Sequence, residues 1–416
     1  MRIELASRPR KHSFLVASAA LLFATWILCL QAATESWFRS KGDLKHLERA
    51  AQIQPLNAEL QQNIGELSMF PPNDDVPSAL VHLEKAVAIN PHSSRAWLSL
   101  ANVYEITGED ARRADAIRHA LAAEPRDTEV QWQAANLFID SDLDSSLQLL
   151  RAVIQHSEQY APAAMQVAYS ASNGNVEKAM LAIPETTSSR LHLIRWLLDR
   201  NQYEATDRVW PTVLTSEGNI TARDTFFYFD SLIERHQVQQ ANSVWSGVQS
   251  KDPVLHASTS PGSLVTNGDF ESELLNGGFG WRYAATSGVT ATLDTSTFHA
   301  GTRSLALQID AENLIECGLT ELIPVEPGAR YRLTAFMHAE ELEAAHGIRF
   351  SVTDAYSHAP LLLTDEVIGS FPWREVDGDF EAPAGTELVK IAFVRSPSEG
   401  IIRGRLWVDD VRIEKR

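Results

Sequence analysis

The sequence predicts a multidomain protein with an N-terminal transmembrane helix, an all-α region of repeated helix pairs, and an all-β sandwich of the jelly-roll type. Three observations lead to this fold class. Phe14 to Ala33 is a stretch of twenty residues without a charged side chain. Apolar residues then recur with helical spacing from about residue 40 to 250. Beyond residue 263, short segments alternate apolar and polar side chains, as strands do.

The composition excludes several classes of protein. Acidic residues outnumber Lys and Arg by 54 to 36, and the resulting formal charge of −18 disfavours nucleic acid as a partner. A chain of 416 residues with 44% apolar side chains is expected to form two or more globular domains. Cys29 and Cys317 lie in different predicted segments, so we expect no disulfide framework. Any metal ligands would be oxygen or imidazole.

The apolar segment over residues 13–33 is predicted to anchor the chain as a single transmembrane helix. Twenty helical residues span about 30 Å, the thickness of the hydrocarbon layer. A cleaved signal peptide and a lipoprotein signal are the alternatives, but both need small residues where large ones stand, such as Leu28 before Cys29. Basic residues flank both ends of the segment, so charge does not fix the orientation. Because a short tail is easily retained, residues 1–12 are predicted to be a basic cytoplasmic tail, with the body on the extracytoplasmic (periplasmic) side.

Residues 34–250 are predicted to form a solenoid of five to six helix pairs. Small residues at fixed spacing let paired helices approach closely, and large apolar ones fill the neighbouring groove. The pattern is fullest over residues 94–125, where Gly108 marks the turn and Arg113 stands at a usually small position. The pattern residues are Trp97, Leu100, Ala101, Tyr104, Ala120 and Pro125. This spacing resembles the tetratricopeptide repeat, and the resemblance implies a concave surface that docks a protein partner.

A change of period separates this region from the C-terminal one. Residues 251–262 have no helical period and contain two prolines, so they are predicted to be a linker. Residues 263–416 contain short alternating segments, such as "SLALQI" and "LVKIAFV", separated by Gly, Pro, Asp and Ser. Many short strands without helices indicate a β-sandwich or jelly roll.

Six motifs make the C-terminal prediction more specific. "NGDFE" at 267–271 is followed by "GW" at 280–281, "HAGTRSL" at 299–305, "VEPGARYRLTAFM" at 325–337, "WREVDGDFEAPAG" at 373–385 and "LWVDDVRI" at 406–413. Their order resembles that of the jelly-roll carbohydrate-binding modules attached to xylanases, cellulases and related secreted enzymes. The resemblance covers residues 263–416 and implies a jelly-roll fold with polysaccharide as a partner.

The same resemblance implies a structural calcium ion. In such modules the opening Glu and the closing Asp pair meet at one end of the sandwich and bind calcium together with backbone carbonyls. The matching residues are Glu271, Asp409 and Asp410, with His299 and Gly301 as carbonyl donors. Oxygen ligands suit Ca²⁺, and the ion would offset repulsion between the acids. The alternative is a solvated strand end with ordinary turn acids.

Sugar binding by stacking requires aromatic faces that are exposed on one sheet. Five aromatic residues fall within the motifs of the fold and are expected in the core: Trp281, Tyr331, Trp373, Phe380 and Trp407. The remaining candidates for a glycan platform are Tyr283, Phe336, Phe350, Tyr356 and Phe393.

The sequence contains no phosphate-binding glycine loop, nucleophile elbow or zinc-protease motif, so we expect a protein that is not an enzyme. The prediction is a membrane-anchored adaptor whose repeats dock a protein partner and whose sandwich binds polysaccharide. Analogy of architecture suggests bacterial envelope or exopolysaccharide assembly. The alternatives are a pure protein–protein scaffold whose sandwich binds no sugar, and a glycan-processing enzyme.

Overall fold

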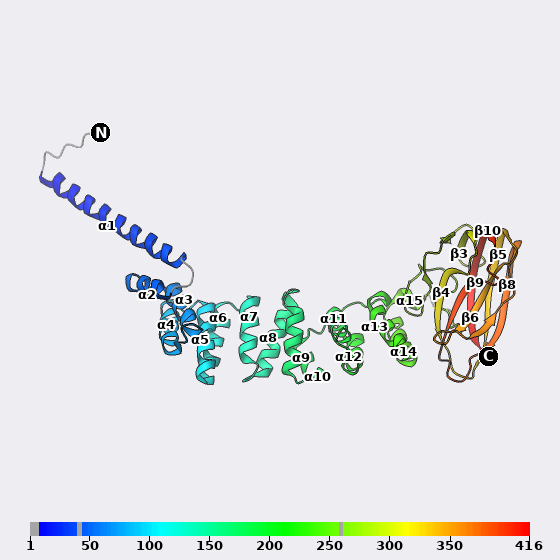
Figure 1. The fold of residues 1–416 in the computed structure, drawn as a ribbon, viewed down its shortest axis with the longest axis horizontal. Helices are drawn as coiled ribbons and strands as arrows, with labels where there is room; N and C mark the ends of the chain where they lie inside the picture. The colour runs from blue at the N-terminus through cyan, green and yellow to red at the C-terminus, as the bar shows by residue number, and fades with distance from the viewer. Residues whose placement is uncertain (1–7, 40–43, 258–260) are drawn as a thin grey trace. The chain divides into compact units, whose positions relative to one another are not determined.

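The computed structural model describes residues 8–39, 44–257 and 261–416, which fall into two compact units, Met1–Pro184 and Glu185–Arg416 (Figure 1). The described part of the first unit is helical, and the second unit contains further helices and the whole β-sandwich. A helical region followed by an all-β region was predicted, and this order is confirmed. The boundary between the compact units lies inside the helical region rather than at residues 251–262.

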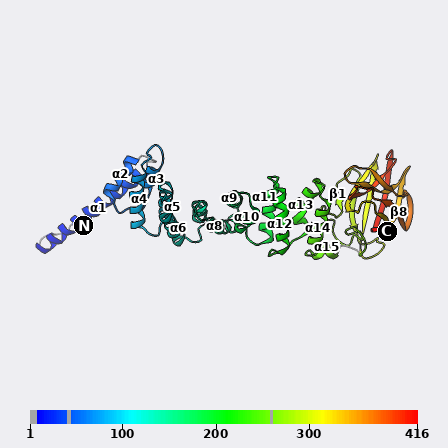
Figure 2. The ribbon, with the colours of Figure 1, turned by 90° about the horizontal axis from the view of Figure 1, so that it is seen from below.

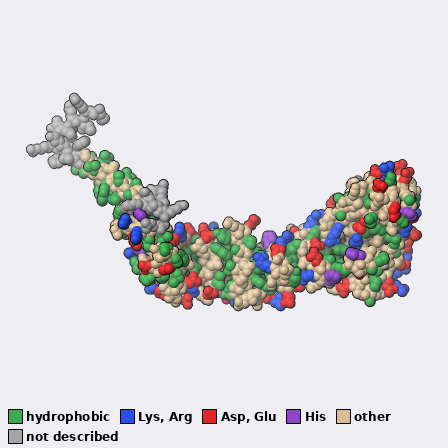
Figure 3. Space-filling model, viewed as in Figure 1, with side chains coloured by type: hydrophobic (Ala, Val, Ile, Leu, Met, Phe, Trp, Pro, Cys, Tyr) green, Lys and Arg blue, Asp and Glu red, His purple; other side chains and the backbone are tan. Residues whose placement is uncertain are grey.

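Helix α1, Arg8–Arg39, covers the segment predicted to anchor the chain. It is longer than that segment and includes charged residues near both ends. Its described apolar side chains are largely exposed (Figure 3): Val16, Leu21, Leu22, Phe23, Trp26 and Leu28. Among the residues that were described fully enough to be searched, no helix has both the length and the apolar character needed to cross a bilayer, so the transmembrane prediction for 13–33 is not supported. Residues 1–7 of the predicted tail lie outside the described residues.

The rest of the first unit consists of short helices joined by tight turns. The bounds are α2 Leu44–Ile53, α3 Ala58–Met69, α4 Val76–Ile89, α5 Ser94–Thr107, α6 Asp110–Ala123, α7 Thr128–Phe138, α8 Leu143–His156, α9 Ala161–Ala171 and α10 Val176–Ala179, followed by a 3₁₀ turn at Met180–Ala182. Asp75, Ser93, Asp127 and Asp142 accept backbone N–H groups at helix N-termini. These caps favour the starts of α4, α5, α7 and α8.

The α5–α6 pair shows how the repeat pattern produces packing. Gly108 ends α5 in the left-handed conformation, with φ of 73°, and lets the chain turn directly into α6. Four pattern residues are buried in the core between the helices: Leu100, Ala101, Tyr104 and Ala120. Trp97 packs partly buried against the same core and donates from Nε1 to the carbonyl of Pro91, and Pro125 follows the end of α6. Arg113 is buried at its small-residue position and pairs with Asp110 at 2.9 Å.

The second unit begins with four helices of the same kind. Their bounds are α11 Thr187–Leu198, α12 Tyr203–Thr215, α13 Ala222–Glu234 and α14 Val238–Gln249. In the described part of the chain, α3 to α14 therefore form six pairs, as the sequence predicted. A further short helix, α15 at Pro253–Ala257, lies within the predicted linker, where Leu255 is buried and Asp252 accepts the N–H of Ala222 at 3.0 Å. This part of the linker is folded against α13, and residues 258–260 lie outside the described residues.

The strands of the second unit gather at its C-terminal end (Figure 2). They form a sandwich of two antiparallel five-stranded sheets with the orders β1-β4-β9-β6-β7 and β2-β3-β10-β5-β8. The strands are β1 Arg282–Tyr283, β2 Val289–Asp294, β3 Ser304–Glu312, β4 Glu316–Pro324, β5 Arg330–Ala344, β6 Ile348–Asp354, β7 Pro360–Leu363, β8 Gly369–Glu381, β9 Leu388–Arg395 and β10 Ile401–Lys415. The inward-facing residues of both sheets form one apolar core. On β5, for example, Leu333, Ala335, Met337 and Ala339 alternate with outward-facing polar and aromatic residues.

The sandwich packs tightly on α13 and α14 through the loop before β1. Phe279 is buried there, with its ring 4.5 Å from that of Phe229 and 5.9 Å from that of Trp245. Gly278 has a φ of 61°, and a Cβ at this position would lie 2.0 Å from the Trp245 ring, so only glycine allows the approach. We call this contact of Phe279 and Gly278 with α13 and α14 the helix–sandwich junction.

Polar contacts extend the junction on both sides. The Tyr356 hydroxyl donates to the carbonyl of Ile233 at 2.9 Å, and its ring stacks on His236 at 3.8 Å. Arg282 reaches Asp230 at 3.5 Å. The last helices and the sandwich are therefore one compact body rather than two modules joined by a free linker.

Candidate functional site

An aromatic cluster lies on the outer surface of the sheet β2-β3-β10-β5-β8. Strand alternation places it there, because Leu406 and Val408 are in the core and Trp407 between them points away from it. On β5, Phe336 and His338 alternate in the same way with core residues. The members are His299, Phe336, His338, Trp373 and Trp407, and we call this surface the aromatic face.

The rings of the aromatic face are in contact with one another. His299 stacks on Phe336 at 3.7 Å, and His338 lies 5.0 Å from Trp407 and 5.7 Å from Trp373. Trp407 is only 4% exposed, whereas Trp373 is half-buried and presents part of its ring to solvent. Phe336 and His338 are also half-buried, but the indole of Trp373 is the largest partly exposed ring of this face and offers the most surface for stacking on a ligand.

Polar groups surround the aromatic face and orient its rings. Trp407 donates from Nε1 to Asp294 Oδ2 at 2.7 Å, and the Arg405 guanidinium lies 5.3 Å above the Trp407 ring. Arg405 also pairs with Glu340 at 2.5 Å, while the carbonyl of Phe371 lies 2.7 Å from His338 Nδ1. An aromatic surface bordered by fixed donors and acceptors is the chemistry that sugar binding requires, because pyranose rings carry both C–H faces and hydroxyl groups.

The loop 299–303 borders the aromatic face and is held from two sides. Asp409 Oδ2 accepts the backbone N–H groups of His299 at 2.8 Å and Ala300 at 3.1 Å. Glu271 Oε1 accepts the N–H of Thr302 at 2.5 Å, and Oε2 accepts the Thr302 hydroxyl at 2.5 Å. We call residues 299–303 the clamped loop. Its clamp consists of two residues predicted to meet, Glu271 and Asp409.

Hydrogen bonding and burial act differently on the two clamp carboxylates. Burial tends to raise the pKa of Glu271, but hydrogen bonds from Thr302 and Arg303 outweigh it and hold the pKa below its ordinary value. Burial raises the pKa of Asp409 to about 6, against the lowering effect of its backbone hydrogen bonds. Asp410 instead lies with Oδ2 at 2.7 Å from His299 Nδ1.

Calcium fits this arrangement poorly. The carboxylates of Glu271 and Asp409 already accept several N–H and O–H groups, so binding a cation would compete with these hydrogen bonds. Gly301 fits against Glu271 so closely that a Cβ there would lie 2.1 Å from Oε1. Within the described residues, no group of three or more His, Cys, Asp or Glu side chains could hold a metal ion. The predicted calcium site, with its donors His299 and Gly301, is not supported by this geometry.

The five predicted platform residues fall in three different environments. Phe350 and Phe393 are fully buried in the core, so the prediction that they form a sugar platform is wrong. Tyr283 packs against the core and donates to the carbonyl of Val289, and Tyr356 serves the helix–sandwich junction. Only Phe336 lies on the aromatic face.

Two tryptophans expected in the core lie outside it. Trp373 and Trp407 belong to the aromatic face rather than to the cluster between the sheets, whereas Trp281, Tyr331 and Phe380 are in the core as predicted. Alternation could have found Trp407, since its neighbours Leu406 and Val408 face the core. It could not have found Trp373, because both of its neighbours, Pro372 and Arg374, are exposed. No sequence motif indicated that His338 belongs to the aromatic face.

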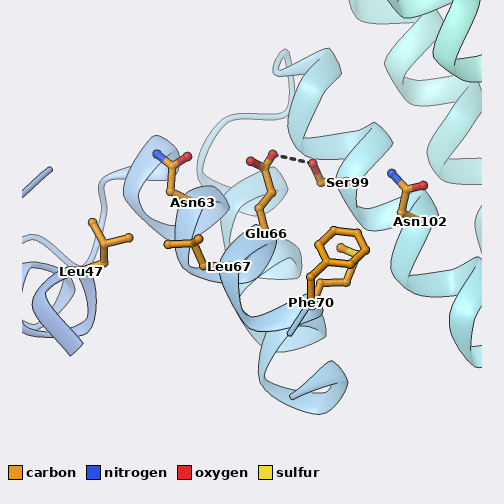
Figure 4. Close-up of a pocket in the computed structure, with 8 residues that line it drawn as sticks. Leu47, Asn63, Glu66, Leu67, Phe70, Ser99 and Asn102 are labelled. Atoms are coloured by element: carbon orange, nitrogen blue, oxygen red, sulfur yellow. Dashed lines mark hydrogen bonds between the residues drawn. The ribbon is translucent and has the colours of Figure 1, made fainter. Parts of the chain in front are cut away.

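A second candidate site lies in the helical region. A pocket of about 460 Å³ is formed by α2, α3 and α5, with apolar walls from Leu47 and Phe70 and the amides of Asn63 and Asn102 at its rim (Figure 4). Glu66 lies between them and accepts the Ser99 hydroxyl at 2.7 Å, as Figure 4 shows. Hydrogen bonds from Gln62, Ser99 and Arg95 outweigh burial and lower the pKa of Glu66, so this carboxylate is charged at neutral pH.

Comparisons with known proteins assign the sandwich. Residues 262–399 match the sequence profile of the family described as "Carbohydrate binding domain", whereas the comparison with curated proteins gave no match. Similar solved structures include one described as "CBM4 structure and function", at 15% identity over 36% of this chain and 99% of that chain, with a TM-score of 0.29. Another is the xylan-binding domain of Paenibacillus barcinonensis Xyn10C, at 14% identity over 36% and 91%, with a TM-score of 0.25. MamA matches at 14% identity over 42% and 90%, with a TM-score of 0.26. The profile match by itself identifies residues 262–399 as a carbohydrate-binding domain.

Proposed function

We propose that this protein is a non-enzymatic adaptor that binds polysaccharide through its C-terminal sandwich and a protein partner through its helical repeats. The observation that carries the first part is the match of residues 262–399 to the carbohydrate-binding family. The aromatic face supplies a surface on which that activity is physically reasonable.

Trp373 would provide the stacking surface for a sugar ring. Its indole is half-buried, so it is held in position by His299 and His338 while part of its face stays open. The Arg405–Glu340 pair lies on the same side of the sheet and would bond to sugar hydroxyls. Stacking on a fixed ring costs little conformational entropy, which favours binding.

A binding assay with Trp373→Ala tests this assignment. Affinity gels or arrays of neutral polysaccharides should show binding by the full chain and a loss of about tenfold or more for the variant. Ile315→Ala, which removes an exposed apolar side chain elsewhere on the sandwich, is the control and should bind like the wild type. Equal binding by all three proteins would place the sugar elsewhere. Absence of binding by the wild type would favour a scaffold without a sugar site.

The helical repeats, which we take as tetratricopeptide-like, would dock the protein partner at the pocket of Figure 4. Phe70 is 59% exposed at its edge, and exposed apolar residues beside polar ones are common at docking sites. Phe70→Asp should abolish crosslinking to a partner in cells, whereas Ile106→Asp, a similarly exposed residue of α5, should not. If both variants crosslink normally, the pocket is not the docking site.

Localisation on the extracytoplasmic side of a membrane, in envelope or exopolysaccharide assembly, stays a prediction from the sequence. The run of exposed apolar side chains on α1 supports attachment, because such surfaces are rarely left in water. Membranes sedimented from a cell lysate should carry the full chain and should lack a variant without residues 1–39. Recovery of the full chain in the soluble fraction would contradict the prediction.

A further inference from the structure

A polar pocket of about 520 Å³ lies between α11 and α13 in the second unit, away from the aromatic face. Its lining includes Ser188, His192, Arg195, Asn219, Arg223 and Phe227. We call it the arginine pocket. None of the surfaces already described includes it.

The charge of the arginine pocket is opposite to that of the chain. The protein carries a formal charge of −18, yet two arginines line this pocket beside a single carboxylate, Asp224. Asp224 accepts the N–H and hydroxyl of Thr221 at 2.9 and 2.7 Å, as part of the capping box of α13. Two guanidinium groups against this one carboxylate leave the pocket with a net positive charge, and the oxygen that caps the helix is already engaged by Thr221.

The two arginines are positioned but not neutralised. Arg195 lies with its guanidinium carbon 4.2 Å from the centre of the Phe227 ring, which holds the guanidinium flat against the aromatic surface. Arg223 donates to the carbonyl of Leu274 at 3.3 Å, a neutral acceptor. Among the described residues, no carboxylate forms an ion pair with either arginine. Their remaining N–H groups can bind an added anion.

The neighbouring groups favour an anion that also carries hydroxyl groups. Ser188 and Asn219 offer hydrogen-bond donors and acceptors for hydroxyl groups, and the Phe227 ring with the Arg195 guanidinium over it offers an apolar surface. A guanidinium binds a carboxylate with two parallel hydrogen bonds, which selects geometry as well as charge. A sugar acid combines all three features.

We infer that the arginine pocket binds a uronate residue of an acidic polysaccharide. The inference rests on the proposed polysaccharide binding and adds a second, charge-selective site on the same compact unit. Arg195 and Arg223 would hold the carboxylate, and Ser188 and Asn219 the hydroxyl groups.

The test compares polygalacturonate, its methyl ester and a neutral glucan as ligands of the full chain. Polygalacturonate should bind, and methyl esterification should weaken binding by tenfold or more because it removes the charge. Arg195→Gln and Arg223→Gln should each weaken polygalacturonate binding similarly. Arg208→Gln, an exposed arginine of α12 outside the pocket, is the matched control and should bind normally. Thermal unfolding of all variants checks that they fold.

Each outcome separates this inference from the proposed function. Three results would overturn the uronate site. The methyl ester could bind as well as polygalacturonate, or the pocket variants could bind as well as the control. Polyglutamate of equal charge could also displace polygalacturonate. Loss of polygalacturonate binding by Trp373→Ala alone would assign the ligand to the aromatic face instead. Neutral glucan binding without any polygalacturonate binding would overturn the inference and leave the proposed function standing.

Discussion

Glu321 is a carboxylic acid in the apolar core of the sandwich. It lies on β4 between Leu319 and Ile323 and is fully buried. Its Oε1 accepts the N–H of Thr266 at 2.7 Å, and within the described residues Oε2 has no hydrogen-bond partner. Burial raises its pKa well above the ordinary value of 4.5, against the lowering effects of Thr266 and Arg282. The folded chain therefore holds this proton more tightly than the unfolded chain does.

Glu321→Gln should remove a pH-dependent loss of stability. Because the folded pKa is raised, the free energy of unfolding of the wild type falls as the pH rises above 4.5 towards the folded pKa. Glutamine retains the acceptor for Thr266 but cannot ionise. The free energy of unfolding of the variant should therefore increase relative to that of the wild type between about pH 5 and about pH 8. The increase should be about 1.4 kcal/mol for each pKa unit of the shift within that range. Urea unfolding at both pH values measures the difference, and a constant difference would show that the carboxyl group titrates alike in both states.

Gly301→Ala should loosen the clamped loop more than a comparable change elsewhere. Gly301 and Gly328 both have positive φ, of 70° and 80°, so alanine strains the backbone similarly at both. Only at Gly301 would the new methyl group collide with Glu271, whereas Gly328 has open space. We expect Gly301→Ala to cost about 1–3 kcal/mol more than Gly328→Ala in thermal unfolding. Equal costs would mean that the contact of Glu271 with the loop contributes no stability.

The positions of single residues could be predicted well where a sequence motif identified them. They were predicted poorly where the position depended on which face of a strand carries the side chain. Glu271 and Asp409 both hold the clamped loop as expected, because the N–H of Val411 donates to the carbonyl of Gly268 and brings the two motifs side by side. Phe350 and Phe393 were misplaced because they stand directly opposite each other on β6 and β9, both facing inward. The register that decides this is a long-range property that a single sequence does not display.

The helix–sandwich junction is the main finding at the scale of elements. Phe279, from the loop before β1, inserts between rings of α13 and α14. Short strands and helix pairs could be predicted from local periodicity, which depends on residues close in sequence. The docking of a loop on helices thirty to fifty residues earlier has no such local signal, so residues 251–262 were predicted as a plain linker.

Phe279→Ala should destabilise the whole second unit. Removing a buried ring of this size costs about 3–5 kcal/mol through lost burial and the cavity left behind. Phe298→Ala, at a phenylalanine that is 38% exposed in the same domain, should cost much less. Denaturant unfolding should show one cooperative transition for the wild-type unit, shifted to lower denaturant in Phe279→Ala. A helical transition that stays unchanged while only the sandwich shifts would contradict the coupling of the two parts.

Removal of calcium should leave the clamped loop intact. Its ends are held by hydrogen bonds to Glu271 and Asp409, which need no ion. The melting temperature in excess chelator should therefore equal that in added calcium. A rise of several degrees with calcium would show that the carboxylates exchange their hydrogen bonds for the ion, because a ligand that binds only the folded state stabilises it.

At the scale of the molecule, the order of an apolar leader, helical repeats and a sandwich could be predicted from the sequence alone. Each of these features repeats or extends over many residues, so a wrong assignment of single residues does not change the prediction for the whole segment. The division into compact units could not be predicted, because the last four repeat helices belong with the sandwich rather than with the preceding helices. The proposed adaptor would present two binding surfaces on one compact unit, the aromatic face and the arginine pocket.

The most direct test of the account is to locate the sugar on the sandwich by NMR. In a ¹⁵N-labelled protein, the indole N–H signal of Trp373 should shift on addition of a bound neutral oligosaccharide, since its ring lies on the aromatic face. The indole of Trp281, buried between the sheets, should not move. Shifts confined to β4, β6 and β9 on the opposite sheet, with Trp373 unchanged, would contradict the claim that the aromatic face is the carbohydrate-binding surface.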